Sequence, residues 1–162
     1  MTEIKMKADH RARISPDYVA DDDYYTPAWV FDALGLEFDM DVCAPVGGVP
    51  WLPAKQSFSI HDDGLMQEWH GRIWCNPPYS SPKQWLDRFI DHGNGIALAP
   101  FSRSRAFLGL WNHSDVICAL PSNFKFQHRD HGTKGIFMPV ALFAIGIENA
   151  ERLVDSKIGR CR

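Results

Sequence analysis

A run of four residues near the middle of the chain directly follows a short apolar segment, residues 73–75. The run is Asn76, Pro77, Pro78 and Tyr79. Two adjacent prolines continue neither a strand nor a helix well, but they stiffen the backbone and carry no N–H groups. The run therefore presents fixed hydrogen-bond acceptors, the side-chain oxygen of Asn76 and a proline carbonyl, beside an aromatic ring.

Such an arrangement can activate an amine or amide nitrogen whose lone pair is delocalised into a ring or carbonyl. If two fixed acceptors take both N–H hydrogens, the lone pair is directed at an electrophile. The effect is electrostatic preorganisation, in which losing one partner costs about 2.7–4 kcal/mol. Stacking of the Tyr79 ring on a flat substrate adds about 1–3 kcal/mol. This chemistry needs no metal ion and no general base with a shifted pKa.

The apolar periodicity around this run predicts alternating strands and helices. Predicted helices lie at 27–35, after Ser80-Ser81-Pro82, at 104–111 and from Ala150 to Val154, with a helical turn at 65–69. Predicted strands lie at 38–44, 58–60, 72–75, 95–100, 116–120 and within 136–145, and residues 45–57 are expected to form an irregular loop. Alternation of this kind is typical of an open α/β sheet with parallel strands.

Composition sets the limits of this interpretation. The chain has 162 residues, 45% of them hydrophobic and 23% charged, as in ordinary soluble domains. Residues 1–23 are predicted to form a mobile arm and residues 24–162 one domain, with Thr26 and Pro27 as the N-cap and first position of the first helix. Neither a membrane span nor a signal peptide is expected, and the four scattered cysteines indicate reduced thiols and a cytoplasmic location.

Three predicted strand ends carry unusual side chains. Asp41 to Ala44 precede a loop rich in Gly and Pro, Asp62-Asp63-Gly64 follow a second strand, and Asn76 follows a third. Ligands in α/β sheets bind at the carboxyl ends of strands, so these three ends are expected to form one pocket.

The chain resembles the phage-type DNA N6-adenine methyltransferases over roughly residues 24–147. The resemblance is carried, in order, by YYTPAWVFDAL (24–34), FDMDVCAP (38–45), DDGLMQEW (62–69), IWCNPPYS (73–80) and ALAPFSRS (97–104). NPPY alone also resembles protein-glutamine and RNA guanine-N2 methyltransferases. The family implies S-adenosylmethionine as cofactor and a Rossmann-like class I methyltransferase sheet with helices on both faces.

The resemblance also implies roles for individual residues. The run from Asn76 to Tyr79 would hold an adenine flipped out of the duplex. Residues near the cofactor would be Thr26 and Pro27 at its methionine end, Asp41, Cys43 and Ala44 near its amino group, and Asp62 or Asp63 at its adenine or ribose.

The chain departs from the family pattern in two ways. The usual glycine-rich first motif is replaced by APVGG at residues 44–48, and only 34 residues separate Asp41 from Asn76. Because that interval is too short for the full set of intervening strands and helices, a trimmed sheet is expected.

Basic residues become more frequent from Asn76 onward. Residues 76–134 hold 7 Lys and Arg against 4 Asp and Glu, although the whole chain has a net charge of −3. The basic residues expected to contact DNA phosphates are Arg103, Arg105, Lys125, Arg129 and Lys134. Residues 123–134 are interpreted either as a solvated loop or as a small target-recognition loop. His128 and His131 lack the matching ligands of a metal site.

These observations predict an enzyme that methylates the N6 amine of adenine in double-stranded DNA. The alternatives are methylation of a protein glutamine or an RNA base, and a catalytically silent DNA-binding domain of the same fold. The basic surplus favours nucleic acid over protein. The intact NPPY run and Asp41 favour an active enzyme over a silent domain.

Overall fold

The computed structural model of the protein describes residues 24–128, 132–135 and 138–162, except for the side chains of Tyr24, His128 and Lys134. The predicted arm at 1–23 and the predicted phosphate contact Arg129 lie outside the described residues. The strands are β1 (Tyr24–Tyr25), β2 (Phe38–Asp41), β3 (Ala54–Ser57), β4 (Ile73–Cys75), β5 (Gly95–Pro100), β6 (Val116–Ala119), β7 (Phe126–His128), β8 (Gly132–Lys134), β9 (Val140–Ile145) and β10 (Arg160–Cys161). The helices are α2 (Ala28–Leu34), α3 (Lys83–His92), α4 (Arg105–His113) and α5 (Ile147–Asp155).

Seven strands form the central sheet, in the order β10-β6-β9-β5-β4-β2-β3. β2 pairs in parallel with both β3 and β4, and β4 pairs in parallel with β5. The predicted α/β sheet is therefore present and mostly parallel. β9 and β10 are antiparallel to their neighbours, which the sequence interpretation did not foresee. The connection from β6 to β9 contains no helix among its described residues, so β9 returns alongside β6 without a crossover.

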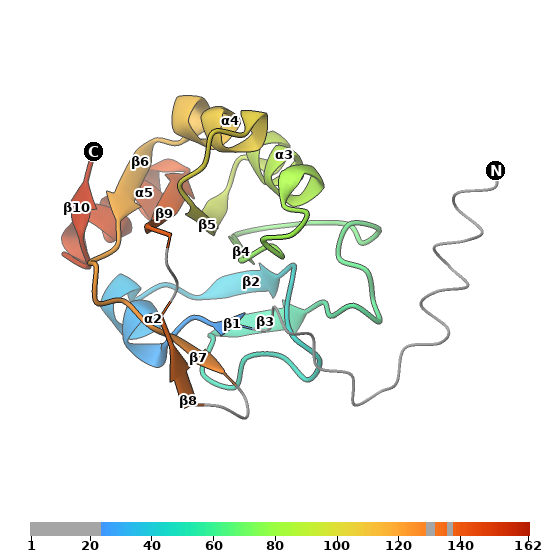
Figure 1. Ribbon diagram of the computed structural model, residues 1–162. Helices are drawn as coiled ribbons and strands as arrows, with labels where there is room; N and C mark the ends of the chain where they lie inside the picture. Colours follow the sequence, from blue (N-terminus) through green and yellow to red (C-terminus); the bar gives the residue numbers. More distant parts are fainter. Residues whose placement is uncertain (1–23, 129–131, 136–137) are drawn as a thin grey trace.

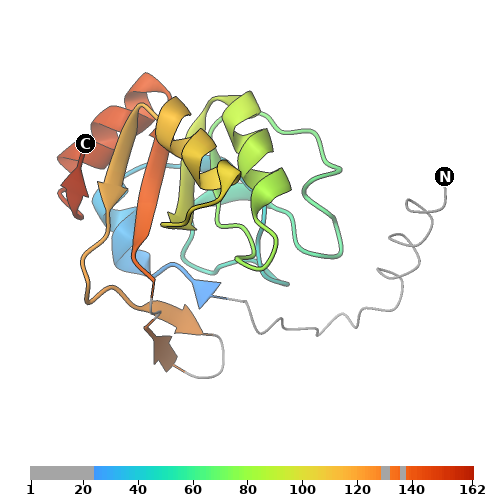
Figure 2. The ribbon, with the colours of Figure 1, turned by 45° about the horizontal axis from the view of Figure 1, so that its top comes forward.

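The helices cover both faces of this sheet, as predicted (Figures 1 and 2). On one face, α2 and α5 pack on the sheet through Phe31, Leu34 and Leu153. On the other face, α3 and α4 lie side by side and bury Phe89 and Leu110. Apolar residues at helical spacing thus build two separate core layers around strands that are buried on both faces.

The prediction for residues 45–60 was wrong in its details. β3 lies inside the predicted loop, while residues 58–60, predicted as a strand, leave the sheet after Phe58 donates its N–H to the Asp41 carbonyl oxygen. β3 is an edge strand whose Lys55, Gln56 and Ser57 are exposed, so it lacks the apolar alternation by which strands are recognised. Residues 65–69 begin with a turn and contain no helix.

The predicted cap of the first helix is also wrong. Pro27, not Thr26, occupies the N-cap position of α2, and no side chain caps that helix. In α3, Pro82 of the Ser80-Ser81-Pro82 group occupies the N-cap position. In α4 the Ser104 side chain caps the helix, because its hydroxyl accepts the Phe107 N–H at 3.2 Å.

A second, three-stranded sheet consists of β1, β7 and β8 (Figure 1). β7 and β8 form an antiparallel hairpin in which Gln127 pairs with Thr133, and Tyr25 pairs with Gln127 from the other side. Residues 126–128 and 132–134 are therefore strands, although residues 123–134 were interpreted as a loop. The hairpin is anchored by Phe124 and Phe126, which are both buried.

Arg72 fixes the start of β4 to α5. Its Nε donates to the Asn149 side-chain oxygen at 2.5 Å, its Nη1 to the Glu37 carbonyl oxygen at 3.0 Å, and its Nη2 forms an ion pair with Glu148. Asn149 is buried, and its own NH₂ group donates to Asn94 and to the Ile145 carbonyl oxygen. Among the described residues, no helix is long and apolar enough to cross a membrane.

We predict that Arg72→Met destabilises the protein by about 1–3 kcal/mol, because it leaves the buried Asn149 oxygen without a donor. The matched control is Lys83→Met, which removes an exposed ion pair to Asp87 on α3 worth about 0.3–0.5 kcal/mol. Urea unfolding of both variants measures the difference. Equal losses in the two variants would contradict a structural role for the Arg72 contacts.

Candidate active site

The carboxyl ends of β2 and β4 lie side by side at one edge of the sheet. The pairing is parallel, with Asp41 opposite Trp74, and the Val42 N–H donates to the Trp74 carbonyl oxygen at 3.1 Å. Asp41 and Asn76 therefore follow neighbouring strands in the same direction, as predicted from the sequence.

The loop that contains Asp62-Asp63-Gly64 reaches the same edge. The Ala44 N–H donates to the Phe58 carbonyl oxygen at 2.9 Å, which holds the beginning of this loop against the end of β2. Gly64 packs directly on Val42, since a Cβ at Gly64 would lie 1.9 Å from the Val42 carbonyl oxygen. The structure thus brings together the three segments that the sequence interpretation assigned to one pocket, although Asp62-Asp63-Gly64 belong to a loop and do not end a strand.

Asp41 is a buried carboxyl group, with 2% of its surface exposed. The Cys43 N–H donates to its Oδ1 at 3.4 Å, and no cation among the described residues pairs with it. Burial raises the pKa of Asp41 to about 7, against the opposing effect of the Cys43 N–H. Burial, together with the neighbouring Cys43 and Asp41, also raises the pKa of the Cys75 thiol. The edge is therefore a place where a positively charged group would be strongly favoured.

Thr26 is equally buried, at 2% exposure, and its hydroxyl has no hydrogen-bond partner within the part of the chain that the structure describes. Its carbonyl oxygen accepts the indole N–H of Trp51 at 2.8 Å, which fastens Thr26 to the loop that follows Ala44. Leaving a buried polar group unpaired costs about 1–3 kcal/mol. The Thr26 hydroxyl is therefore available for a hydrogen bond with a bound group.

Tyr79 belongs to a rigid run after β4 in which Pro77 is buried and Asn76, Pro78 and Tyr79 are half-buried. The Tyr79 hydroxyl is buried without a partner among the residues described, and this burial raises its pKa above the ordinary value. Its ring meets Phe126 of β7 edge to face, with 6.4 Å between the ring centroids. The phenol is consequently neutral, and the hairpin supports its ring from one side.

Asp62 and Asp63 both stabilise the local turn. The Asp62 Oδ2 accepts the N–H and the hydroxyl of Ser59 at 2.8 and 3.0 Å, and the Asp63 Oδ1 accepts the Leu65 N–H at 3.3 Å. Asp63 adopts a left-handed backbone conformation with φ 53°. Asp62 is exposed and Asp63 half-buried beside Gly64.

Arg88 supports this loop and was missed in the sequence interpretation. Its guanidinium donates to the carbonyl oxygens of Gly64, Leu65 and Gln67 and lies 4.4 Å from the centroid of the Trp69 ring. Partial burial lowers the pKa of Arg88. Since its partners are backbone carbonyls, no residue type in the loop could have predicted this contact with Arg88. The one feature of the sequence that points to it is the position of Arg88 on the largely apolar side of the helix predicted after Pro82.

The described basic residues predicted to contact DNA are all exposed. Arg103 and Arg105 follow the carboxyl end of β5, the neighbour of β4, and Lys125 precedes β7. The position of Lys134 in β8 is described but its side chain is not, and Arg129 lies outside the described residues.

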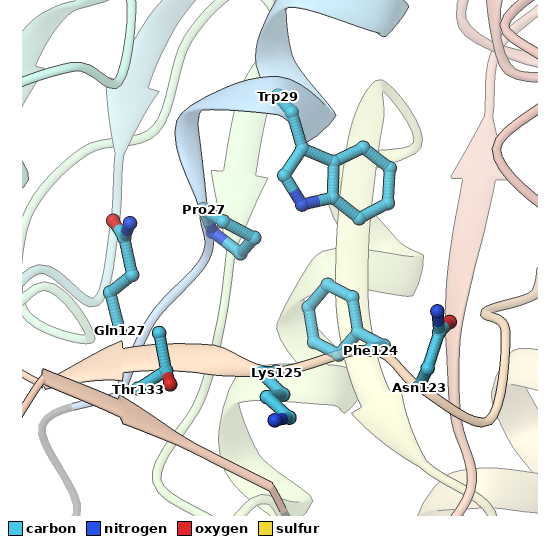
Figure 3. A pocket seen from close by; sticks show the side chains of 7 residues that line it. All are labelled: Pro27, Trp29, Asn123, Phe124, Lys125, Gln127 and Thr133. Carbon is cyan, nitrogen blue, oxygen red and sulfur yellow. The ribbon is translucent and has the colours of Figure 1, made fainter.

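A pocket of about 330 Å³ lies between the start of α2 and the β7–β8 hairpin (Figure 3). It is lined by Pro27, Trp29, Asn123, Phe124, Lys125, Gln127 and Thr133. Trp29 is a large aromatic side chain with 44% of its surface exposed. Within residues 24–128, 132–135 and 138–162, no group of three or more His, Cys, Asp or Glu side chains is placed to hold a metal ion, and all four cysteines are free thiols.

Part of the chain is similar in sequence to known proteins. Residues 16–95 match the sequence model of the family described as DNA N-6-adenine-methyltransferase (Dam). The match begins inside the segment predicted as an arm and ends at the start of β5.

A relative, the DNA N-6-adenine-methyltransferase of Haemophilus phage HP1 (strain HP1c1), is 34% identical over 70 residues. This alignment covers 40% of the present chain and 39% of the phage protein, so the chain spans about two-fifths of that relative's length. The resemblance to DNA N6-adenine methyltransferases is therefore confirmed for residues 16–95, the part of the chain that contains both Asp41 and the NPPY run.

Proposed function

We propose that the protein transfers a methyl group from S-adenosylmethionine to the N6 amino group of adenine in double-stranded DNA. The observation that carries this proposal is the placement of the NPPY run beside a buried carboxyl group without a cationic partner among the described residues, at one edge of a mostly parallel sheet. The family match of residues 16–95 and the name of the phage relative support the same reaction.

The sheet supports the narrower assignment to a trimmed, Rossmann-like class I methyltransferase. Between Asp41 and Asn76, where every residue is described, the elements are β3 and β4, and no helix lies there. Ligands of such sheets bind at the carboxyl ends of the strands, where these residues lie.

The polar groups at this edge fit S-adenosylmethionine. The Asp41 carboxylate would pair with the cationic methionine end of the cofactor, while Cys43 and Ala44 line the end of β2. Thr26 and Pro27 would contact the methionine end from the segment that precedes α2, and this contact would give the buried Thr26 hydroxyl a partner. Gly47 and Gly48, with φ of 85° and 74°, form the turn that stands in for the usual glycine-rich loop.

Asp62 and Asp63 extend the same site toward the adenine or ribose of the cofactor. Gly64 of their loop packs on Val42, and the Arg88 guanidinium donates hydrogen bonds to backbone carbonyls of the loop. We propose that one of the two carboxylates accepts hydrogen bonds from the ribose hydroxyls or the adenine amine.

S-adenosylmethionine supplies an electrophilic methyl group when bound. Asn76 and the Pro77 carbonyl would accept the two N6 hydrogens of the target adenine and so direct its lone pair toward that methyl group. Tyr79, held by Phe126, would stack on the flipped base and fix its plane. The nitrogen becomes acidic only after it has attacked, so these residues need only orient it.

The direct test is incubation of the protein with methyl-labelled S-adenosylmethionine and, separately, DNA, RNA and protein. We predict label on adenine N6 of DNA, and a decrease of about two to three orders of magnitude in turnover for Asn76→Ala with cofactor affinity nearly unchanged. Tyr79→Phe, which keeps the ring and removes a buried hydroxyl, should stay close to the native rate. Label on glutamine or RNA alone, or native turnover in Asn76→Ala, would overturn the proposal.

Asp41 should make stability and cofactor binding depend on pH in opposite directions. Because the pKa of Asp41 is raised to about 7 by folding, the folded state retains a proton that the unfolded chain has released. Stability of the free protein should therefore fall as the pH rises from about 4 to about 7, by about 4 kcal/mol, and stay level above that. Affinity for the cationic cofactor should rise through the same range.

Asp41→Asn should remove both pH dependences, making the free protein more stable at pH 8 and its cofactor binding weaker. Asp39→Asn is the control on the same strand. The ion pair with Lys55 holds the pKa of Asp39 below its usual value, so this substitution should lower stability at pH 8. Thermal melting and titration calorimetry distinguish the two. An Asp41→Asn variant less stable than the native protein at pH 8 would contradict the proposed state of this carboxyl group.

Salt dependence should identify the DNA-facing surface. Replacing Arg103, Arg105 or Lys125 with Ala should reduce the slope of log affinity against log salt by about 0.9 for each DNA phosphate that the variant no longer neutralises. Lys55→Ala is the control, because Lys55 is exposed at the amino end of β3, opposite to the edge where Asn76 lies. Identical slopes in all three variants and the control would place the DNA surface elsewhere.

A further inference from the structure

The pocket between α2 and the hairpin has the size and lining of a small-ligand site. Its volume of about 330 Å³ falls within the range of such sites. Lys125 is the single charged residue among those that line it, and no carboxyl group does. The pocket therefore suits a ligand with a flat, neutral part that enters the pocket and a negatively charged part that stays outside it, near Lys125.

Trp29 offers the flat surface. Phe124 meets its ring edge to face at 6.1 Å and an interplanar angle of 68°, and 44% of Trp29 nevertheless remains exposed. In Figure 3 the two rings lie close together at the same end of the pocket. An aromatic side chain that is held in place but left partly open is suited to stacking with a second planar ring.

Asn123, Gln127 and Thr133 offer the hydrogen bonds. Each of the two amides carries both donors and acceptors, and Thr133 lies directly opposite Gln127 in the hairpin. Side-chain amides of this kind pair with the edges of nucleobases. Lys125, exposed beside them, is placed to meet the phosphate attached to such a base.

This pocket is separate from the NPPY run. Successive side chains of a strand point to opposite faces, so Gln127 points away from the side on which Phe126 meets Tyr79. Neither Asn76 nor Tyr79 lines the pocket. A base bound here is consequently not the adenine presented to Asn76.

We propose that the pocket binds one unpaired base of DNA, other than the methylated adenine, by stacking on Trp29 and by hydrogen bonds from Gln127 and Asn123. The inference rests on the proposed function, because it requires DNA as the substrate. An extruded target leaves its former partner, or a neighbouring base, without its own pairing, and a second pocket would hold that base and keep the duplex open.

The test is fluorescence anisotropy with two labelled duplexes, one fully paired and one that carries a single bulged base. The native protein should bind the bulged duplex more tightly, since the cost of extrusion is already met. Trp29→Ala should lose affinity on the order of ten-fold and lose this preference, while Trp29→Phe, which keeps a ring, retains most of both. Gln127→Leu should also lose the preference.

The control is Leu108→Ala, which removes an exposed apolar side chain from α4, away from the pocket. A photocrosslink from 5-iodouracil at the bulge should map to Trp29. Cofactor affinity, measured by calorimetry without DNA, should be native in all variants, which also shows that they are folded.

Three results would overturn the inference. Native DNA affinity and preference in Trp29→Ala and Gln127→Leu, while the native protein methylates DNA, would refute the pocket and leave the proposed function standing. Loss of cofactor binding in these variants would assign the pocket to the cofactor. A native protein that neither binds nor methylates DNA would refute both proposals together.

Discussion

The parallel pairing of β2 with β4 is the constraint on which the site depends. It sets Asp41 opposite Trp74, and the Val42–Trp74 hydrogen bond carries that register to the last residues of both strands. Trp74 is fully buried and meets Phe31 of α2 and Phe38 of β2 edge to face, at 4.8 and 5.7 Å. A slip of one residue would turn Trp74 out of this core, so the packing that stabilises the sheet also aligns the carboxyl group with the NPPY run.

The chemistry at this edge lowers the stability of the free protein. A buried carboxyl group and a buried hydroxyl, neither with a partner of its own among the described side chains, both oppose folding, and the apolar layers around them must offset that cost. Buried polar groups of this kind are retained where a ligand supplies the hydrogen bonds or the opposite charge that they lack. Asp39 shows the contrast: two residues earlier on the same strand, a lysine and a backbone N–H satisfy the carboxylate, and its pKa falls instead of rising.

Sequence patterns predicted the elements whose signals are local and strong. The strand from Gly95 to Pro100 and the helix after Pro82 follow from uninterrupted apolar periodicity, and the strand-end position of Asn76 follows from the prolines after it. β3 was missed because an exposed edge strand has no apolar face. A strand was predicted where β9 lies, but its antiparallel direction was missed because pairing direction depends on the connection and not on composition. Arg88 was missed because backbone carbonyls, its partners, are present in every loop.

The hairpin shows how a short amphipathic element can support two sites at once. Phe124 and Phe126 lie on its buried side, with 4.9 Å between their ring centroids. Phe126 also contacts the Tyr79 ring, and Phe124 also contacts the Trp29 ring. Four aromatic rings thus run from the NPPY run to the second pocket. Because this apolar side anchors the hairpin, the opposite side is free to carry Lys125 and Gln127 toward a ligand. Within β7, strand alternation therefore places Phe126 against Tyr79 and turns Gln127 to the other side, where it lines the second pocket.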